Sequence, residues 1–159
     1  MKLLLVAEYR DKKLLASCNE LMAFSDQMDC DSVMCLVGSE SDLPRFNGTL
    51  YLADVENYGE YNPDAHKQFV LDVVEKEHAD MVVFSHSSYG WDLAPRVAFA
   101  MKAAQVSEVV EVVDGIPVVP VCNAKLRRDV RVKTEKSVVT IQSGAFGLSE
   151  DPTGTPTVE

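Results

Sequence analysis

The chain has few cysteines, and no two of them stand at a spacing typical of a metal site or a redox motif. The four cysteines are Cys18, Cys30, Cys35 and Cys122, and none forms a C-x-x-C pair. This pattern argues against a zinc site and against a disulfide framework. We expect reduced, structural thiols, no bound metal and a cytoplasmic location.

Positive charge is also scarce, and long hydrophobic runs are missing. There are 15 Lys and Arg residues against 25 Asp and Glu, for a formal net charge of -10. Such an acidic chain is repelled by phosphate, so nucleic acid and anionic membranes are excluded as expected partners. The apolar run 3–7 is too short for a signal peptide or a membrane span. Small molecules or other proteins are the expected partners.

The motifs of the common nucleotide and hydrolase sites are absent. The sequence contains neither a P-loop nor a G-x-G-x-x-G pattern, and no G-x-S-x-G surrounds its serines. The sites that these motifs build are therefore excluded. A hydrolase that uses Ser87 or Ser88 with His86 is disfavoured, but it remains a hypothesis.

The sequence does contain alternating strand and helix patterns. With 159 residues and 47% hydrophobic content it is long enough for one domain with a real core. Strands are predicted at 3–7, 32–37, 49–53 and 81–84, and helices at 14–28, from Asn62-Pro63 to Glu77, and from about Asp92 to Ala104. This order predicts an α/β fold with a doubly wound, mainly parallel, Rossmann-like sheet.

The C-terminal third is richer in strand patterns. Segments 108–113, 117–121, 130–133 and 137–141 are predicted to add β-strands to the sheet, some of them antiparallel. We assign residues 1–147 to the domain and 148–159 to a linker or flexible tail. A basic cluster is interpreted as a charged sheet edge rather than an anion-binding stripe; its members are Lys125, Arg127, Arg128, Arg131 and Lys133.

The polar loop 85–96 follows a predicted buried strand and leads into a helix. In an open α/β sheet this is where ligands are received. We expect Asp92 or Gly90 to cap the helix, with Pro95 in its first turn. The candidate cofactor-binding residues, which could hold an anion at the helix start, are Ser87, Ser88, Gly90, Asp92 and Arg96.

A structural role for the same loop is preferred over direct phosphate binding. In that interpretation Asp92 only caps the helix and Pro95 stiffens the turn. Arg96 then pairs with Glu8, which ends the first predicted strand. The two residues would meet if the strands at 3–7 and 81–84 are neighbours, because their carboxyl ends lie at the same sheet edge.

The segment Gly90 to Ala98, GWDLAPRVA, resembles the glycine-basic-Asp-x-Ala-Pro-Arg-x-Ala stretch of the electron transfer flavoprotein α subunit, in its N-terminal domain. Supporting matches are Val6-Ala7-Glu8, Val37-Gly38, Ser107-Glu108-Val109, Pro120-Val121, Val138-Val139-Thr140 and Gly144-Ala145-Phe146. The resemblance covers about residues 1–147. The sequence departs from the family at Trp91, where a basic residue is usual, at Gln142, where arginine is common, and near Ala124, where glycine is usual.

The resemblance implies a fold of the adenine-nucleotide α-hydrolase type and a role as an electron carrier component without catalytic residues of its own. In that family FAD is bound mainly by a C-terminal domain, which is absent here, so FAD binding by this chain alone is not expected. The implied partners are a β-type subunit and a flavin domain or redox partner. The alternative function is a stand-alone nucleotide-binding module for AMP or FAD. The chain is either one domain of a longer α subunit or a stand-alone relative.

Overall fold

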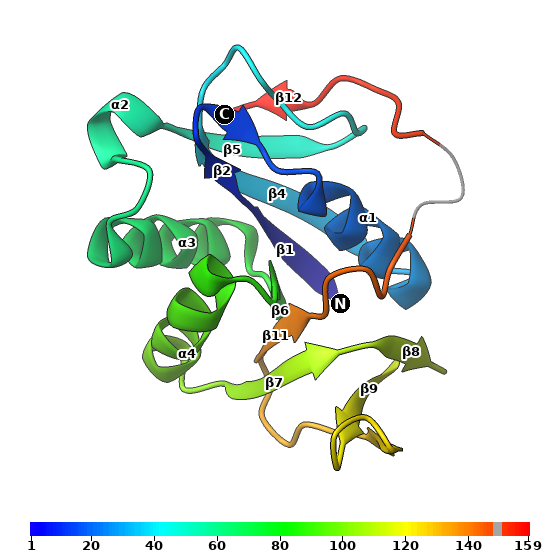
Figure 1. Ribbon diagram of the computed structural model, residues 1–159. Coiled ribbons are helices and arrows are strands. Elements are labelled where there is room, and N and C mark those ends of the chain that lie inside the picture. The colour runs from blue at the N-terminus through cyan, green and yellow to red at the C-terminus, as the bar shows by residue number, and fades with distance from the viewer. Residues whose placement is uncertain (148–150) are drawn as a thin grey trace.

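Strands and helices alternate along most of the chain in the computed structural model, which describes residues 1–147 and 151–159 (Figure 1). The strands are β1 (Lys2–Ala7), β2 (Tyr9–Arg10), β3 (Lys13–Leu14), β4 (Asp31–Gly38), β5 (Thr49–Asp54), β6 (Met81–Ser85), β7 (Ala104–Val109), β8 (Glu111–Val113), β9 (Ile116–Val121), β10 (Leu126–Asp129), β11 (Ser137–Ile141) and β12 (Thr157–Val158). The helices are α1 (Ser17–Met28), α2 (Val55–Tyr58), α3 (Pro63–Glu77) and α4 (Ser88–Met101). Among the described residues no helix is long and apolar enough to cross a bilayer.

The central sheet has seven strands in the order β12-β5-β4-β1-β6-β11-β7. Each neighbouring pair in it is parallel. Helix α1 covers one face, and α3 and α4 cover the other (Figure 1). The predicted α/β fold with a doubly wound, mainly parallel sheet is therefore confirmed. Strands β1 and β6 are neighbours, which was the condition for the predicted pairing of Arg96 with Glu8.

Strand β1 shows why the sheet needs helices on both sides. Its residues alternate between two hydrophobic clusters: Leu3, Leu5 and Ala7 pack in the cluster that contains α1, whereas Leu4 and Val6 pack in the one that contains α3 and α4. All five side chains are buried. A strand that is apolar on both faces is stable only when both faces are covered.

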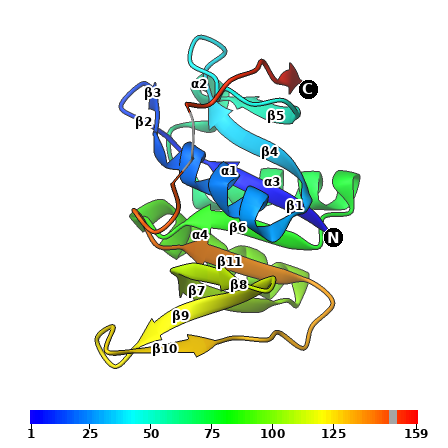
Figure 2. The same ribbon diagram turned by 90° about the vertical axis from the view of Figure 1, so that its right-hand side faces the viewer.

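The C-terminal strands divide between two sheets. Strands β7 and β11 join the parallel sheet, while β10-β9-β8 form a separate antiparallel sheet beyond its β7 edge (Figure 2). The prediction of added strands, some antiparallel, is confirmed. The predicted strand 130–133 is wrong: β10 is Leu126–Asp129, because Cys122, Asn123 and Ala124 turn the chain at positive φ and the ladder with β9 starts directly after this turn.

The predicted helix 14–28 begins later than the pattern suggests. Leu14 belongs to a short hairpin in which β3 pairs with β2, closed by Asp11 and Lys12 at φ of 51° and 61°. Its backbone N–H donates to the Asp42 carboxylate at 2.7 Å. Helix α1 therefore starts at Ser17. The predicted start of the next long helix is confirmed, because Asn62 caps α3 and accepts from the Ala65 N–H.

The end of the chain returns to the sheet. Strand β12 pairs in parallel with β5, and Lys76 of α3 forms a salt bridge with Glu159 at 2.6 Å. Of the predicted linker or flexible tail, 148–159, residues 148–150 lie outside the described residues and 157–158 form this edge strand. The domain boundary at residue 147 stays a prediction.

Gly90 lies in the first turn of α4, directly against the end of β6. A Cβ atom at this position would lie 2.0 Å from the Ser85 carbonyl oxygen. We expect Gly90→Ala to lower the free energy of unfolding by about 1–3 kcal/mol, the usual cost of overpacking. Urea denaturation measures the loss. Gly147→Ala is the matched control, because its Cβ would have no neighbour within 4 Å; equal stability of both variants would contradict the expectation.

Candidate functional site

The candidate site lies at the carboxyl ends of β1 and β6. From these two neighbouring strands the chain leaves toward opposite faces, into α1 and α4. The sheet order therefore reverses between them. In open α/β sheets the crevice at such a switch point is the usual place for a ligand.

A hydrogen-bond relay through Ser87 ties the start of α4 to β1. Ser87 has an extended backbone and is the N-cap residue, and its Oγ accepts from the Gly90 N–H at 3.1 Å. The same hydroxyl donates to Glu8 Oε1 at 2.6 Å. The helix start is thus joined to Glu8 after strand β1, as expected, but the residue that makes the link is Ser87 and not Arg96.

The predicted roles of Asp92, Pro95 and Arg96 are corrected by this geometry. Because Ser87 is the cap, α4 begins at Ser88 and Pro95 lies inside the helix. Arg96 does not pair with Glu8: it donates to Asp92 through Nε at 3.1 Å and through a terminal guanidinium nitrogen at 3.2 Å. The two residues are one turn apart on the same exposed helix face, where such pairs form readily.

The other candidate binding residues are only partly brought together. Ser87, Ser88 and Gly90 share the first turn of α4, whereas Arg96 lies two turns further on. The Ser88 Oγ accepts from Arg10 of β2 at 3.2 Å, and Gly90 is buried against β6. A direct contact of these residues with a cofactor stays a prediction.

The geometry also opposes the hydrolase hypothesis. The Nδ1 of His86 bonds the Thr140 hydroxyl at 2.8 Å, and its Nε2 faces the Glu108 carboxylate at 3.3 Å. The Ser87 hydroxyl donates its hydrogen bond to Glu8 instead. Within residues 1–147 and 151–159, no hydrogen bond joins His86 to a serine hydroxyl, which a serine nucleophile would need.

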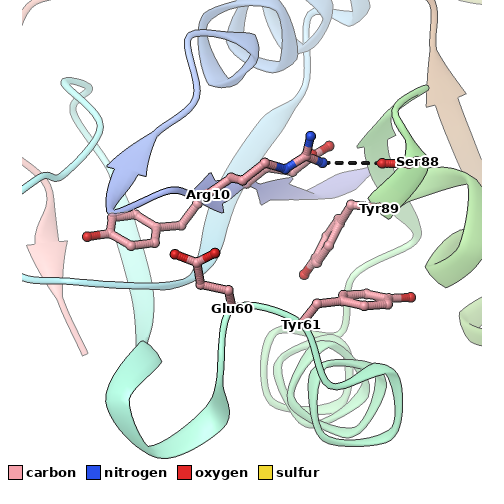
Figure 3. A pocket seen from close by; sticks show the side chains of 7 residues that line it. Arg10, Glu60, Tyr61, Ser88 and Tyr89 are labelled. Carbon is pink, nitrogen blue, oxygen red and sulfur yellow. Dashed lines mark hydrogen bonds between the residues drawn. The ribbon is translucent and has the colours of Figure 1, made fainter.

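A cavity of about 350 Å3 opens at the switch point (Figure 3). It is lined by three segments that are far apart in the sequence: residues 8–10 after β1, Glu60 and Tyr61 before α3, and Ser88 and Tyr89 at the start of α4. Apart from Glu8 and Ser88, none of these residues was a candidate from the sequence. The position after a predicted strand is a local signal for Glu8 and Tyr9, and it also marks the loop 85–96, which contains Ser88 and Tyr89. No local signal marks Glu60 and Tyr61.

Glu8 is the buried polar group of this pocket. The residue is 3% exposed, and its Oε2 atom has no hydrogen-bond partner among the described residues. Burial raises the pKa of Glu8 above the ordinary carboxyl range, against the opposing effects of the Ser87 hydrogen bond and the Arg10 charge. One oxygen of this buried carboxyl group is therefore left without a hydrogen bond among the described residues.

An aromatic cluster forms one wall of the pocket. The rings of Tyr61, His66 and Tyr89 contact one another edge to face, with centroids 5.6–5.9 Å apart. His66 is buried and bonds the Tyr89 hydroxyl and the Gly59 carbonyl, each at 3.0 Å. Burial and the Asp92 carboxylate raise the pKa of Tyr61 to about 12, so its hydroxyl remains a donor to Asp92. These bonds hold the segment before α3 against α4.

The basic cluster lies away from this site. Arg127 and Arg128 belong to β10, the edge of the three-stranded sheet, and Arg127 pairs with Glu111 of β8. The expected charged sheet edge is confirmed for these two residues. In the part of the chain that the structure describes, no group of His, Cys, Asp and Glu side chains is arranged to hold a metal ion.

The fold and the pocket define an α/β domain with a parallel sheet and a crevice at its switch point. The chain belongs to the electron transfer flavoprotein domain family, whose model matches residues 47–159. It is also 33% identical to the electron transfer flavoprotein subunit alpha of Bacillus subtilis (strain 168) over 52 residues, which are 33% of this chain and 16% of the relative. The resemblance to the α-type N-terminal domain is thereby confirmed.

The buried Glu8 carboxyl should make stability depend on pH. Its raised pKa means that the native state holds this proton to higher pH than the unfolded chain does, so the free energy of unfolding falls as the pH rises past the ordinary carboxyl pKa of about 4.3. Glu8→Gln removes this contribution. We expect the stability of the unmodified protein relative to Glu8→Gln to fall between pH 4 and pH 8 in urea denaturation. A difference that does not change, or that rises, would contradict the raised pKa.

Proposed function

We propose that this domain serves electron transfer as a scaffold that docks a β-type subunit and supports a flavin held by another domain. Membership of the electron transfer flavoprotein domain family supports the general role. The similarity to an α subunit supports the choice of a β-type partner. The domain positions its partners, and the redox chemistry takes place on the flavin.

An exposed apolar stripe on α4 carries the docking proposal. Trp91 is 68% exposed and Phe99 is 87% exposed, and the exposed Pro95 lies between them. Positions four residues apart follow one side of a helix, so the three side chains form a continuous strip. The opposite face of α4 packs in the core through Leu93 and Val97. Exposed aromatic side chains of this size are typical anchors of protein interfaces.

Removing the two aromatic side chains should strongly weaken docking. We expect Trp91→Ser combined with Phe99→Ser to weaken the Kd for the cognate β-type subunit by about 100-fold or more, since aromatic anchors commonly contribute at least about 2 kcal/mol each. Isothermal titration calorimetry measures the Kd. Leu126→Ser is the control, because Leu126 is also exposed, at 59%, but lies on β10. Unchanged binding by the double variant would refute docking through α4.

The position of the pocket favours a second candidate, the nucleotide-binding module. A cavity at the switch point is where this kind of sheet commonly receives a nucleotide. Its lining supports that function less well, because Glu8 and Glu60 face the cavity together with only one cation, Arg10. A phosphate group would have to approach two carboxyl groups.

Thermal melting separates the two candidates. For a scaffold we expect AMP, ATP and FAD at millimolar concentration to leave the Tm unchanged within about 1 °C. A nucleotide present at 100 times its Kd would add about 2.7 kcal/mol and raise the Tm by several degrees. A clear rise with AMP alone would contradict the scaffold function and support the alternative.

A further inference from the structure

Asn47 and Gly48 lie in the connection between β4 and β5, where residues 39–48 form neither helix nor strand. Asn47 is exposed. The backbone nitrogen that follows an asparagine can attack the side-chain amide, and a glycine in this place has no Cβ to block the approach. The Gly48 N–H donates to no backbone carbonyl among the described residues. Both reacting groups are therefore accessible.

The other four asparagines of the chain lack this combination. Asn19 lies in α1 and Asn57 in α2, where the helical backbone is fixed. Asn62 is followed by a proline, whose nitrogen carries no hydrogen to release. Asn123 is the nearest counterpart, since it is exposed and lies in a turn, but alanine follows it. A Cβ on the next residue is thus the main difference between Asn123 and Asn47.

The same two residues contact the segment that contains strand β12. The Gly48 carbonyl accepts from the Thr157 N–H at 2.9 Å, and a Cβ added to Gly154 would lie 2.4 Å from the Oδ1 atom of Asn47. Strand β12 has two residues and lies beside β5 at the edge of the sheet (Figure 1). Such a short edge element opens at a low free-energy cost. A change of main-chain geometry at residues 47–48 therefore acts directly on the attachment of β12.

We propose that Asn47-Gly48 is a site of spontaneous deamidation, and that the isoaspartate product loosens β12 from β5. The Gly48 nitrogen loses its proton and bonds to Cγ of Asn47, the bond from Cγ to the side-chain nitrogen breaks, and ammonia leaves. Water then opens the resulting succinimide ring at either carbonyl, which gives aspartate or isoaspartate. Isoaspartate adds the side-chain methylene group to the main chain and so displaces the Gly48 carbonyl from the Thr157 N–H. The site is separate from the α4 stripe, and its test requires no β-type subunit.

Peptide mapping by mass spectrometry tests the reaction. The purified protein is incubated at mildly alkaline pH and physiological temperature, and the conversion of each asparagine is followed over time. We expect Asn47 to convert at least about tenfold faster than Asn123, because no Cβ on the following residue hinders the attack. Electron-transfer fragmentation distinguishes the two products, and isoaspartate should be among them. Equal rates at the two residues, or no conversion at Asn47, would overturn the proposal.

Amide hydrogen exchange tests the effect on β12. In the protein that contains isoaspartate we expect the Thr157 amide to exchange at least about tenfold faster than in fresh protein, since its hydrogen bond to Gly48 is lost. Freshly purified Asn47→Asp is the matched control, because it adds the same charge with an unaltered main chain, and it should exchange like the fresh protein. Asn47→Gln, incubated in the same way, should also keep slow exchange, because its longer side chain would have to close a larger ring. Unchanged exchange after conversion, or equally fast exchange in fresh Asn47→Asp, would overturn the release of β12.

Discussion

The hydrogen bonds of one hydroxyl group, that of Ser87, hold the functional end of this domain together. It accepts from the first turn of α4 and donates to Glu8 at the end of β1. This is possible because β1 and β6 pair in parallel with Val6 opposite Phe84, which brings the residues that follow each strand to the same edge. The link joins the start of α4 to the residue that follows β1, at the edge where the pocket opens.

Helix α4 contributes to two separate surfaces of the domain. Its first turn closes the pocket through Ser88 and Tyr89, and Gly90 lets the turn lie directly against β6. Its outer side presents Trp91 and Phe99 to solvent. A helix that is capped at one end and packed along one face is a rigid element, which is what the proposed docking function requires. The pocket and the exposed stripe therefore lie on different parts of one helix.

Most elements could be predicted because their signals are local. The strand at 81–84 is a continuous apolar run, the strand at 137–141 is rich in β-branched residues, and Asn62-Pro63 starts a helix by cap and ring geometry. The error at the start of α4 arose because several residues can play the same local role. Asp92 is a good cap residue, but Ser87 takes that position once the helix packs against β6, and Asp92 is then free to pair with Arg96.

The sequence by itself determined the alternation of elements, the two-sided core and the family, because each of these follows from periodicity or from a contiguous motif. It also marked Glu8 as the polar residue that ends β1. Only the tertiary structure decided what surrounds Glu8, since Ser87, Glu60 and Tyr61 come from distant segments. Which oxygen of a carboxyl group is satisfied and which is left free depends on contacts across the sheet edge, and such contacts leave no pattern in a single sequence.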